Sequence, residues 1–146
     1  MTMRIYLDNC CFNRPYDDQS HLKIRLESEA KLGIQEKIRS SEYDLVWSYI
    51  LDYENKKNPF LERKEQIAKW RSYAKEDVQE DETVLLVAKE IRGHGIKKMD
   101  ALHLACAVRA QAVFFLTTDA GILKKALLIQ NIIITDPLGF IKEVLQ

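Results

Sequence analysis

The chain has 146 residues, of which 47% are hydrophobic, and its 22 basic and 22 acidic residues balance to a formal net charge of zero at pH 7. This size and hydrophobic content predict a single domain, residues 1–146, with a substantial core. The balanced charge excludes a protein that attracts nucleic acid through its overall field, so any polyanion must be bound by a local group of cations.

Cysteine usage and hydropathy indicate the cellular setting. Cys10 and Cys11 are adjacent and Cys106 lies far from them, which fits neither an even disulfide framework nor a CxxC pair. The longest apolar runs are much shorter than the roughly 20 residues of a membrane helix, and the sequence shows no basic-then-apolar leader with a cleavage site. We therefore expect reduced thiols in a soluble, cytoplasmic protein with no membrane partner.

In chain order, predicted strands alternate with helical or polar sequence. Runs rich in β-branched and aromatic residues predict strands at 3–7, 44–47, 113–117 and 131–135. Between the first two, residues 20–39 carry apolar side chains at an imperfect helical spacing and predict an amphipathic helix. This alternation predicts an α/β fold with a central parallel sheet and helices on both faces.

Further helices are predicted after the second strand. The charged stretch 52–81 indicates two helices that divide near Pro59, because proline disfavours a helical conformation in the residue before it. Residues 83–92 predict another helix, and residues 99–109 predict a largely buried one, since apolar side chains cover a broad face. Short helices are expected after Asp119 and at the C-terminal end.

Four acidic side chains stand where an α/β fold can turn them toward one cleft: Asp8, Glu54, Asp100 and Asp119. Asp8 and Asp119 each follow a predicted buried strand, and the carboxyl edge of a parallel sheet is where ligands bind. Two carboxylates about 4 Å apart repel by roughly 4 kcal/mol at an effective dielectric near 20, so converging acids raise one another's pKa unless a cation neutralises them. Carboxylate oxygens favour hard ions, so the sequence predicts a Mg²⁺ or Mn²⁺ site.

Each acid also fits a structural role on its own. Asp119 stands where it could cap the following helix, and Asp100, in the first turn of a helix, complements the helix dipole. Glu54 lies in a charged stretch that is typical of a solvated helix face. His103, one turn after Asp100, could support the site, but we favour a buried core role for it.

Four segments together resemble one family: Ile5-Tyr6-Leu7-Asp8, Ser48 with Glu54 six residues later, Asp100-Ala101-Leu102-His103-Leu104-Ala105, and Phe115-Leu116-Thr117-Thr118-Asp119. The pattern resembles the PIN domain, the fold of VapC-type toxin ribonucleases and of related RNA-processing and repair nucleases, over nearly the whole chain. The resemblance implies a PIN-like three-layer α/β/α sandwich, with strands 44–47, 3–7, 113–117 and 131–135 adjacent in that order. It also implies that the four acids bind the metal and serve catalysis, with Thr117 lining the same site.

The resemblance implies metal-dependent hydrolysis of RNA. The chain would be a Mg²⁺- or Mn²⁺-dependent endoribonuclease, with an antitoxin protein as its partner where it acts as a toxin. Two departures affect this expectation: Asn9 and Cys10 follow the first Asp, where many family members carry a hydroxyl residue, and Gly121 stands where some carry a further acid. The sequence therefore supports a second metal less well than the first. We assign Cys10 and Cys11 to packing.

Local cations could supply the phosphate contacts that the net charge does not. Arg14 and the lysine pairs at 56–57, 97–98 and 124–125 each lie within a few residues of one of the acids. Individually they are ordinary solvated charges, but together they could rim an acidic cleft with phosphate-binding groups.

A homodimer is also expected, through the helix at 20–39 or the helices between 56 and 75. Phe60, Ile67 and Trp70 form an apolar stripe in a charged segment, and core packing explains this stripe equally well.

Two other functions stay open. A receiver-type signalling domain shares the α/β plan but needs an acid at the end of a middle strand, where the strand 44–47 is followed by Ser48. A non-catalytic PIN-like interaction module would use the acids only as helix caps and solvated charges.

Overall fold

A five-stranded, wholly parallel sheet forms the centre of the computed structural model, which describes residues 2–144. The strands follow the order β3-β2-β1-β4-β5 across the sheet. Their bounds are Met3–Leu7 for β1, Tyr43–Ser48 for β2, Ala74–Val78 for β3, Phe114–Leu116 for β4 and Ile133–Thr135 for β5. The four predicted strands are all present, and their predicted order is confirmed.

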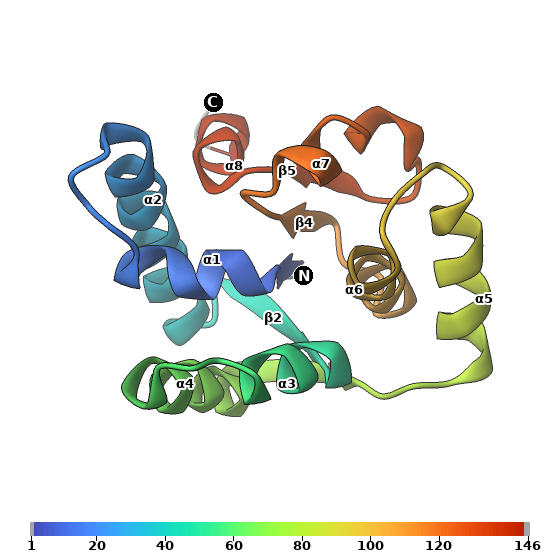
Figure 1. The fold of residues 1–146 in the computed structure, drawn as a ribbon, viewed down its shortest axis with the longest axis horizontal. Helices are drawn as coiled ribbons and strands as arrows, with labels where there is room; N and C mark the ends of the chain where they lie inside the picture. The colour runs from blue at the N-terminus through green and yellow to red at the C-terminus, as the bar shows by residue number, and fades with distance from the viewer. Residues whose placement is uncertain (1, 145–146) are drawn as a thin grey trace.

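Helices cover both faces of this sheet. Figure 1 shows α2 and α8 on one face, and α6 backed by α5 on the other. The α-helices are α1 (Asn9–Asn13), α2 (Leu22–Arg39), α3 (Tyr49–Lys56), α4 (Leu61–Ala68), α5 (Glu82–Arg92), α6 (Lys98–Arg109), α7 (Ala120–Leu123) and α8 (Pro137–Val144), with 3-10 turns at Arg14–Tyr16, Lys69–Tyr73 and Ala126–Leu128. None of the helices between residues 2 and 144 has the length and hydrophobicity that a membrane span requires. The arrangement confirms the predicted three-layer α/β/α sandwich.

The central strands are buried on both sides, which explains why their sequences are apolar without alternation. Toward α6, the ring of Tyr6 stacks on that of Phe115 in the neighbouring strand, with 5.2 Å between centroids. Elsewhere in the core, Phe12 of α1 meets Trp47 edge-on at 5.3 Å. All four side chains are fully buried, so they hold both helical layers against the sheet.

Two elements differ from the sequence analysis. Residues 74–78, expected to be helical, form the edge strand β3, which pairs with β2. An edge strand exposes one side to water and tolerates charged side chains such as Lys75 and Glu76. Because the same residue types favour helices in isolation, composition predicted the wrong element. Residues 9–13, for which no element was expected, form α1.

Most of the apolar stripe formed by Phe60, Ile67 and Trp70 belongs to the hydrophobic core. Ile67 and Trp70 are 2% and 8% exposed, whereas Phe60 is 57% exposed and packs against Arg63. Core packing, the alternative to a self-association face, therefore accounts for two of its three members.

Parallel pairing brings the carboxyl ends of the strands to one edge of the sheet. Asp8 follows β1, Ser48 ends β2 and Thr117 follows β4. The edge where β1, β2 and β4 end therefore carries three polar side chains that are each at most 5% exposed.

Candidate metal centre

Asp8 lies at the junction of β1 and α1 and is held there by hydrogen bonds. Its backbone N–H donates to the carbonyl of Leu116 (2.9 Å), which continues the pairing of β1 with β4. Its Oδ1 accepts from the N–H of Asn9 (2.8 Å), so the side chain caps α1. Its Oδ2 accepts from the Thr117 hydroxyl (2.8 Å). The carboxylate is thus oriented on both sides and is 5% exposed.

Asp8, Glu54 and His103 converge at this edge. One ligand-type atom from each lies within 4.8 Å of the others. His103 Nε2 is 3.7 Å from Asp8 Oδ1 and makes a short hydrogen bond to Glu54 Oε1. Glu54 is carried by α3 and His103 by α6, so three elements that are distant in sequence build one group. Two carboxylates and an imidazole within this distance are a donor set that a divalent cation can use.

A series of hydrogen bonds fixes the His103 imidazole on the side away from Glu54. His103 Nδ1 lies 2.6 Å from the Tyr6 hydroxyl, which lies 2.7 Å from Ser48 Oγ. Ser48 Oγ accepts from the N–H of Leu51 (3.2 Å), as the cap of α3. Burial raises the pKa of Tyr6 well above its usual value, so its phenol stays neutral and serves as a hydrogen-bonding link. The network thereby couples the end of β2 to the ring that touches Glu54.

His103 is fully buried beside negatively charged groups. Burial by itself lowers the pKa of this imidazole, but the hydrogen bond to Glu54 and the nearby charges of Asp8 and Asp100 outweigh burial and raise it. The acidic surroundings therefore favour the protonated form of His103 more strongly than burial disfavours it.

Asp100 faces the same group from the first turn of α6 and is half-buried. Burial, followed by the negative charges of Asp8 and Asp119, raises its pKa to about 6, and the nearby His103 opposes this rise only in part. Its side chain makes no hydrogen bond to any residue between 2 and 144. Asp100 therefore shares the electrostatic field of the site although it lies outside the tight group.

Asp119 serves as a helix cap, which was one of its two predicted roles. Its Oδ1 accepts from the N–H groups of Gly121 (2.7 Å) and Ile122 (3.3 Å) at the start of α7. Its own N–H donates to Thr117 Oγ1 (3.1 Å), the hydroxyl that also bonds Asp8. Its Oδ2 makes no hydrogen bond within the described part of the chain. Capping therefore leaves one oxygen of Asp119 free to act at the site.

Of the four acids, the structure brings Asp8 and Glu54 together and leaves Asp100 and Asp119 at the margin of that group. Thr117 lies beside Asp8, where the resemblance placed it.

Two residues at the centre were assigned elsewhere by the sequence analysis. Cys10, assigned to packing, lies 3.5 Å from Asp8 Oδ2 and 3.4 Å from Thr117 Oγ1, and its sulfur accepts from the Thr118 N–H. Cys11 is a buried packing residue, as expected. His103 was expected in the core and is buried there, yet it also contacts both converging acids. The sequence signal was its position three residues after Asp100, which puts both on one face of α6.

The cations that could rim the site are partly engaged elsewhere. Arg14 Nε lies 3.2 Å from Glu27, and its guanidinium also pairs with Asp17. Lys125 donates to the carbonyl of Gly95 (2.9 Å). These two of the predicted phosphate contacts are therefore already occupied within the fold.

We expect Asp100→Asn to stabilise the metal-free protein near neutral pH and to have little effect near pH 4. The pKa of Asp100 rises from 3.8 to about 6 on folding, so folding takes up a proton between these values and the wild type loses stability as the pH rises through them. Asparagine carries no charge and escapes this loss. Denaturant unfolding in chelator at about pH 4 and about pH 7.5 measures the difference.

The control for this variant is Glu82→Gln, which removes an exposed acid from the first turn of α5 and should not stabilise the protein at neutral pH, because a charged acid in a first turn complements the helix dipole. A loss of stability in Asp100→Asn at neutral pH would show that Asp100 is a structural residue.

Comparison with known proteins supports the fold and leaves the activity to be inferred. No protein-family model and no curated protein matches this sequence. The structure is similar to a chain in the crystal structure of VapBC2 from Rickettsia felis bound to a DNA fragment from their promoter, with a TM-score of 0.60 and 15% sequence identity. The match covers 92% of this chain and 98% of that chain. At this identity the likeness shows a shared α/β fold.

Proposed function

We propose that this chain, as one PIN-like domain of residues 1–146, hydrolyses phosphodiester bonds of RNA with Mg²⁺ or Mn²⁺. The observation that carries the proposal is the convergence of Asp8 and Glu54, with Asp100 in their field, at the carboxyl edge of a parallel sheet. The fold likeness to a VapBC2 chain supports it, because the PIN family that the sequence resembles includes VapC-type toxins.

Each site residue has a role in this proposal. Asp8, Glu54, Asp100 and Asp119 would hold the ion, and Thr117 keeps Asp8 oriented through their hydrogen bond. Held by these acids, a divalent ion would supply Lewis-acid chemistry toward a phosphodiester and a water nucleophile. His103 positions Glu54 from the buried side, and Tyr6 positions His103 in turn.

The proposal extends to partners and setting. RNA is the proposed substrate, and an antitoxin protein is the proposed partner, because the structurally similar chain comes from a VapBC2 complex. We also propose that the chain acts in the cytoplasm and that it forms a homodimer, which sedimentation of the purified protein would reveal.

We expect the purified protein to cleave single-stranded RNA into products with 5′-phosphate ends when Mn²⁺ or Mg²⁺ is added, and to be inactive in chelator. Calcium should bind without supporting turnover, because its looser coordination positions a water poorly. Gel analysis of labelled RNAs measures cleavage. A rise in melting temperature with Mn²⁺ measures binding, since a ligand of the native state stabilises it.

A non-catalytic interaction module is the second candidate, and two contacts favour it. Asp119 is already used as a cap, and Glu54 is already paired with a histidine. In that case a broad set of RNAs and single-stranded DNAs would show no cleavage above that of Asp8→Asn, and Mn²⁺ would neither bind in calorimetry nor raise the melting temperature. The receiver alternative is not proposed, because Ser48 at the end of β2 caps α3 and bonds Tyr6.

A further inference from the structure

A cavity of about 570 Å³ lies between α3, α5 and α6. Tyr53 and Met99 line it, and each immediately precedes a proposed metal-binding acid, Glu54 on α3 and Asp100 on α6. The two helices that deliver these acids therefore also form two walls of the cavity. The cavity is therefore linked to the acidic group through these two helices.

The walls of the cavity are largely apolar and include two aromatic rings. Leu85 of α5 and Leu102 of α6 lie opposite the tyrosines of α3. Tyr49 is fixed by a hydrogen bond from its hydroxyl to Glu80 (3.2 Å), whereas Tyr53 is 40% exposed. Lys57 Nζ lies 4.1 Å from the centroid of the Tyr53 ring and covers one face of it. A nucleobase can therefore stack on the other face of the ring, because every base has a π-face.

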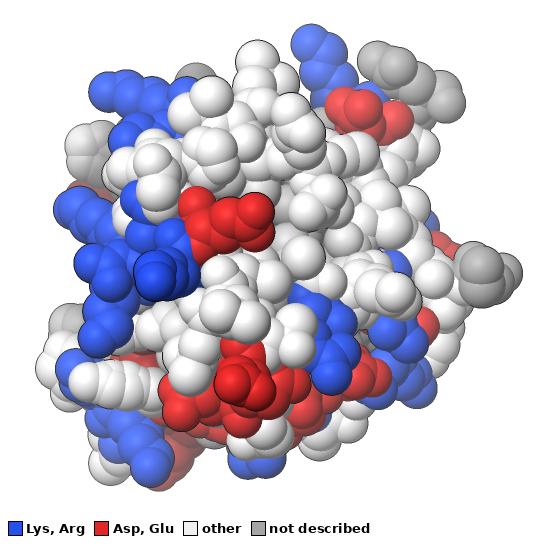
Figure 2. All heavy atoms as spheres, turned by 90° about the vertical axis from the view of Figure 1, so that its right-hand side faces the viewer, with Lys and Arg blue, Asp and Glu red and all other residues white. Residues whose placement is uncertain are grey.

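Cations gather at the same cavity. Lys89, Arg92 and Lys98 line it, and none of their three side chains makes a hydrogen bond or ion pair with any residue between 2 and 144. Glu80 is the acid among the lining residues, and Tyr49 already bonds it. Figure 2, which views the side of the molecule that carries α5, shows lysine and arginine side chains along its left-hand edge and acidic side chains toward its lower border. In a chain of zero net charge, this is a local group of unpaired cations.

We propose that this cavity binds a base of single-stranded RNA, stacked on Tyr53, while Lys98 and Arg92 bind the flanking phosphates. Apolar walls and an aromatic ring suit the base, and the unpaired cations suit the backbone. A protein partner would fill the apolar cavity equally well, but the cations beside a proposed phosphodiesterase centre favour a polyanion. The inference rests on the proposed function, since the RNA bound in the cavity would be the substrate that the proposed site cleaves.

The test is the affinity for short, fluorescently labelled oligouridine and oligoadenine RNAs, measured by anisotropy in the presence of chelator. Tyr53→Leu keeps the apolar volume and removes the ring, so it should weaken binding of both RNAs about tenfold, while Tyr53→Phe should bind like the wild type. Lys98→Ala should weaken binding and reduce the slope of log affinity against log salt by about one.

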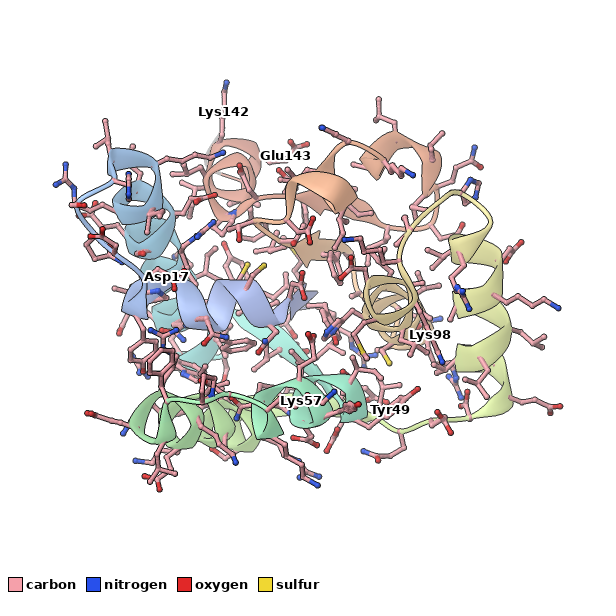
Figure 3. All side chains as sticks on the ribbon, viewed as in Figure 1. Asp17, Tyr49, Lys57, Lys98, Lys142 and Glu143 are labelled. Atoms are coloured by element: carbon pink, nitrogen blue, oxygen red, sulfur yellow. The ribbon has the colours of Figure 1, made fainter. Side chains whose placement is uncertain are left out.

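Two variants at residues that do not line the cavity serve as controls. Tyr73→Leu removes a ring that is 41% exposed, close to the exposure of Tyr53. Lys142→Ala removes an exposed lysine of α8, which Figure 3 shows at the top of the molecule, whereas Tyr49 and Lys98 lie at the lower right. Both controls should bind RNA like the wild type.

Equal losses in the cavity variants and the controls would overturn the inference, as would a wild type that binds neither RNA. A Tyr53→Leu variant that breaks a dimer in sedimentation while its RNA affinity is unchanged would identify the cavity as an interface between copies. Binding in chelator is independent of hydrolysis. If RNA affinity depends on Tyr53 but no RNA is cleaved, the base-binding cavity is supported and the ribonuclease activity is refuted. If RNA is cleaved but its affinity does not depend on Tyr53, the ribonuclease activity is supported and the base-binding cavity is refuted.

Discussion

Asp8→Asn is expected to slow metal-dependent RNA cleavage about a thousandfold or more, because a metal's stabilisation of the transition state is worth several kcal/mol. The fold should survive the change. Asparagine caps helices as well as aspartate does, and it retains an oxygen that can accept from the Asn9 N–H. The free energy of unfolding in chelator should therefore stay within about 1 kcal/mol of the wild type. Single-turnover cleavage and denaturant unfolding measure the two quantities.

The matched control is Asp81→Asn, which alters another helix cap, because Asp81 Oδ1 accepts from the Val84 N–H at the start of α5 (2.7 Å). This variant should cleave RNA at the wild-type rate. Asp100→Asn should lose activity like Asp8→Asn. If Asp8→Asn melts well below the wild type in chelator, Asp8 is chiefly a structural hub for Thr117 and α1, and its catalytic assignment is wrong.

Lys31→Met is expected to raise the free energy of unfolding by about 3 kcal/mol near pH 6 and by much less near pH 10. Lys31 is 3% exposed, and burial, helped by nearby Arg39, lowers its pKa from 10.5 to about 7. At about 1.4 kcal/mol for each pKa unit, this corresponds to about 4 to 5 kcal/mol, from which about 1 kcal/mol is lost with the cation–π contacts of the ammonium to Phe12 and Trp70. Methionine fills a similar volume without a charge.

The pH dependence follows from the lowered pKa of Lys31. Below about pH 7 both the folded and the unfolded chain carry the ammonium, so the folded protein bears the full cost of burying it. Between about 7 and 10.5 only the unfolded chain keeps the proton, so folding releases it and the stability of the wild type rises with pH. Lys23→Met, an exposed position on the same helix, is the control and should show little of this dependence.

Denaturant unfolding at the two pH values tests this expectation. Equal destabilisation of Lys31→Met at both would show that the amine is retained for its contacts. Its Nζ lies 5.0 Å from the ring centroid of Phe12 and 5.6 Å from that of Trp70.

The sequence by itself determined the layers of the fold and the edge where the site lies. Strands β1 and β4 are buried on both faces, so their apolar runs are strong local signals, and the polar residue after each run marks the carboxyl edge. Asp8 and Thr117 follow directly from this pattern, and their hydrogen bond needs only that the two strands be neighbours.

Tertiary structure alone decided what stands beside those residues. His103 contacts Glu54 only because α6 and α3 pack together, and a buried histidine in an apolar helix looks the same in sequence whether or not an acid meets it. The charged strand β3 depends on the exposed edge of β2, since its own residues favour a helix. Strand patterns and helix caps depend on residues close in sequence and can be predicted from it, whereas the contacts of a side chain depend on which elements pack together in the fold.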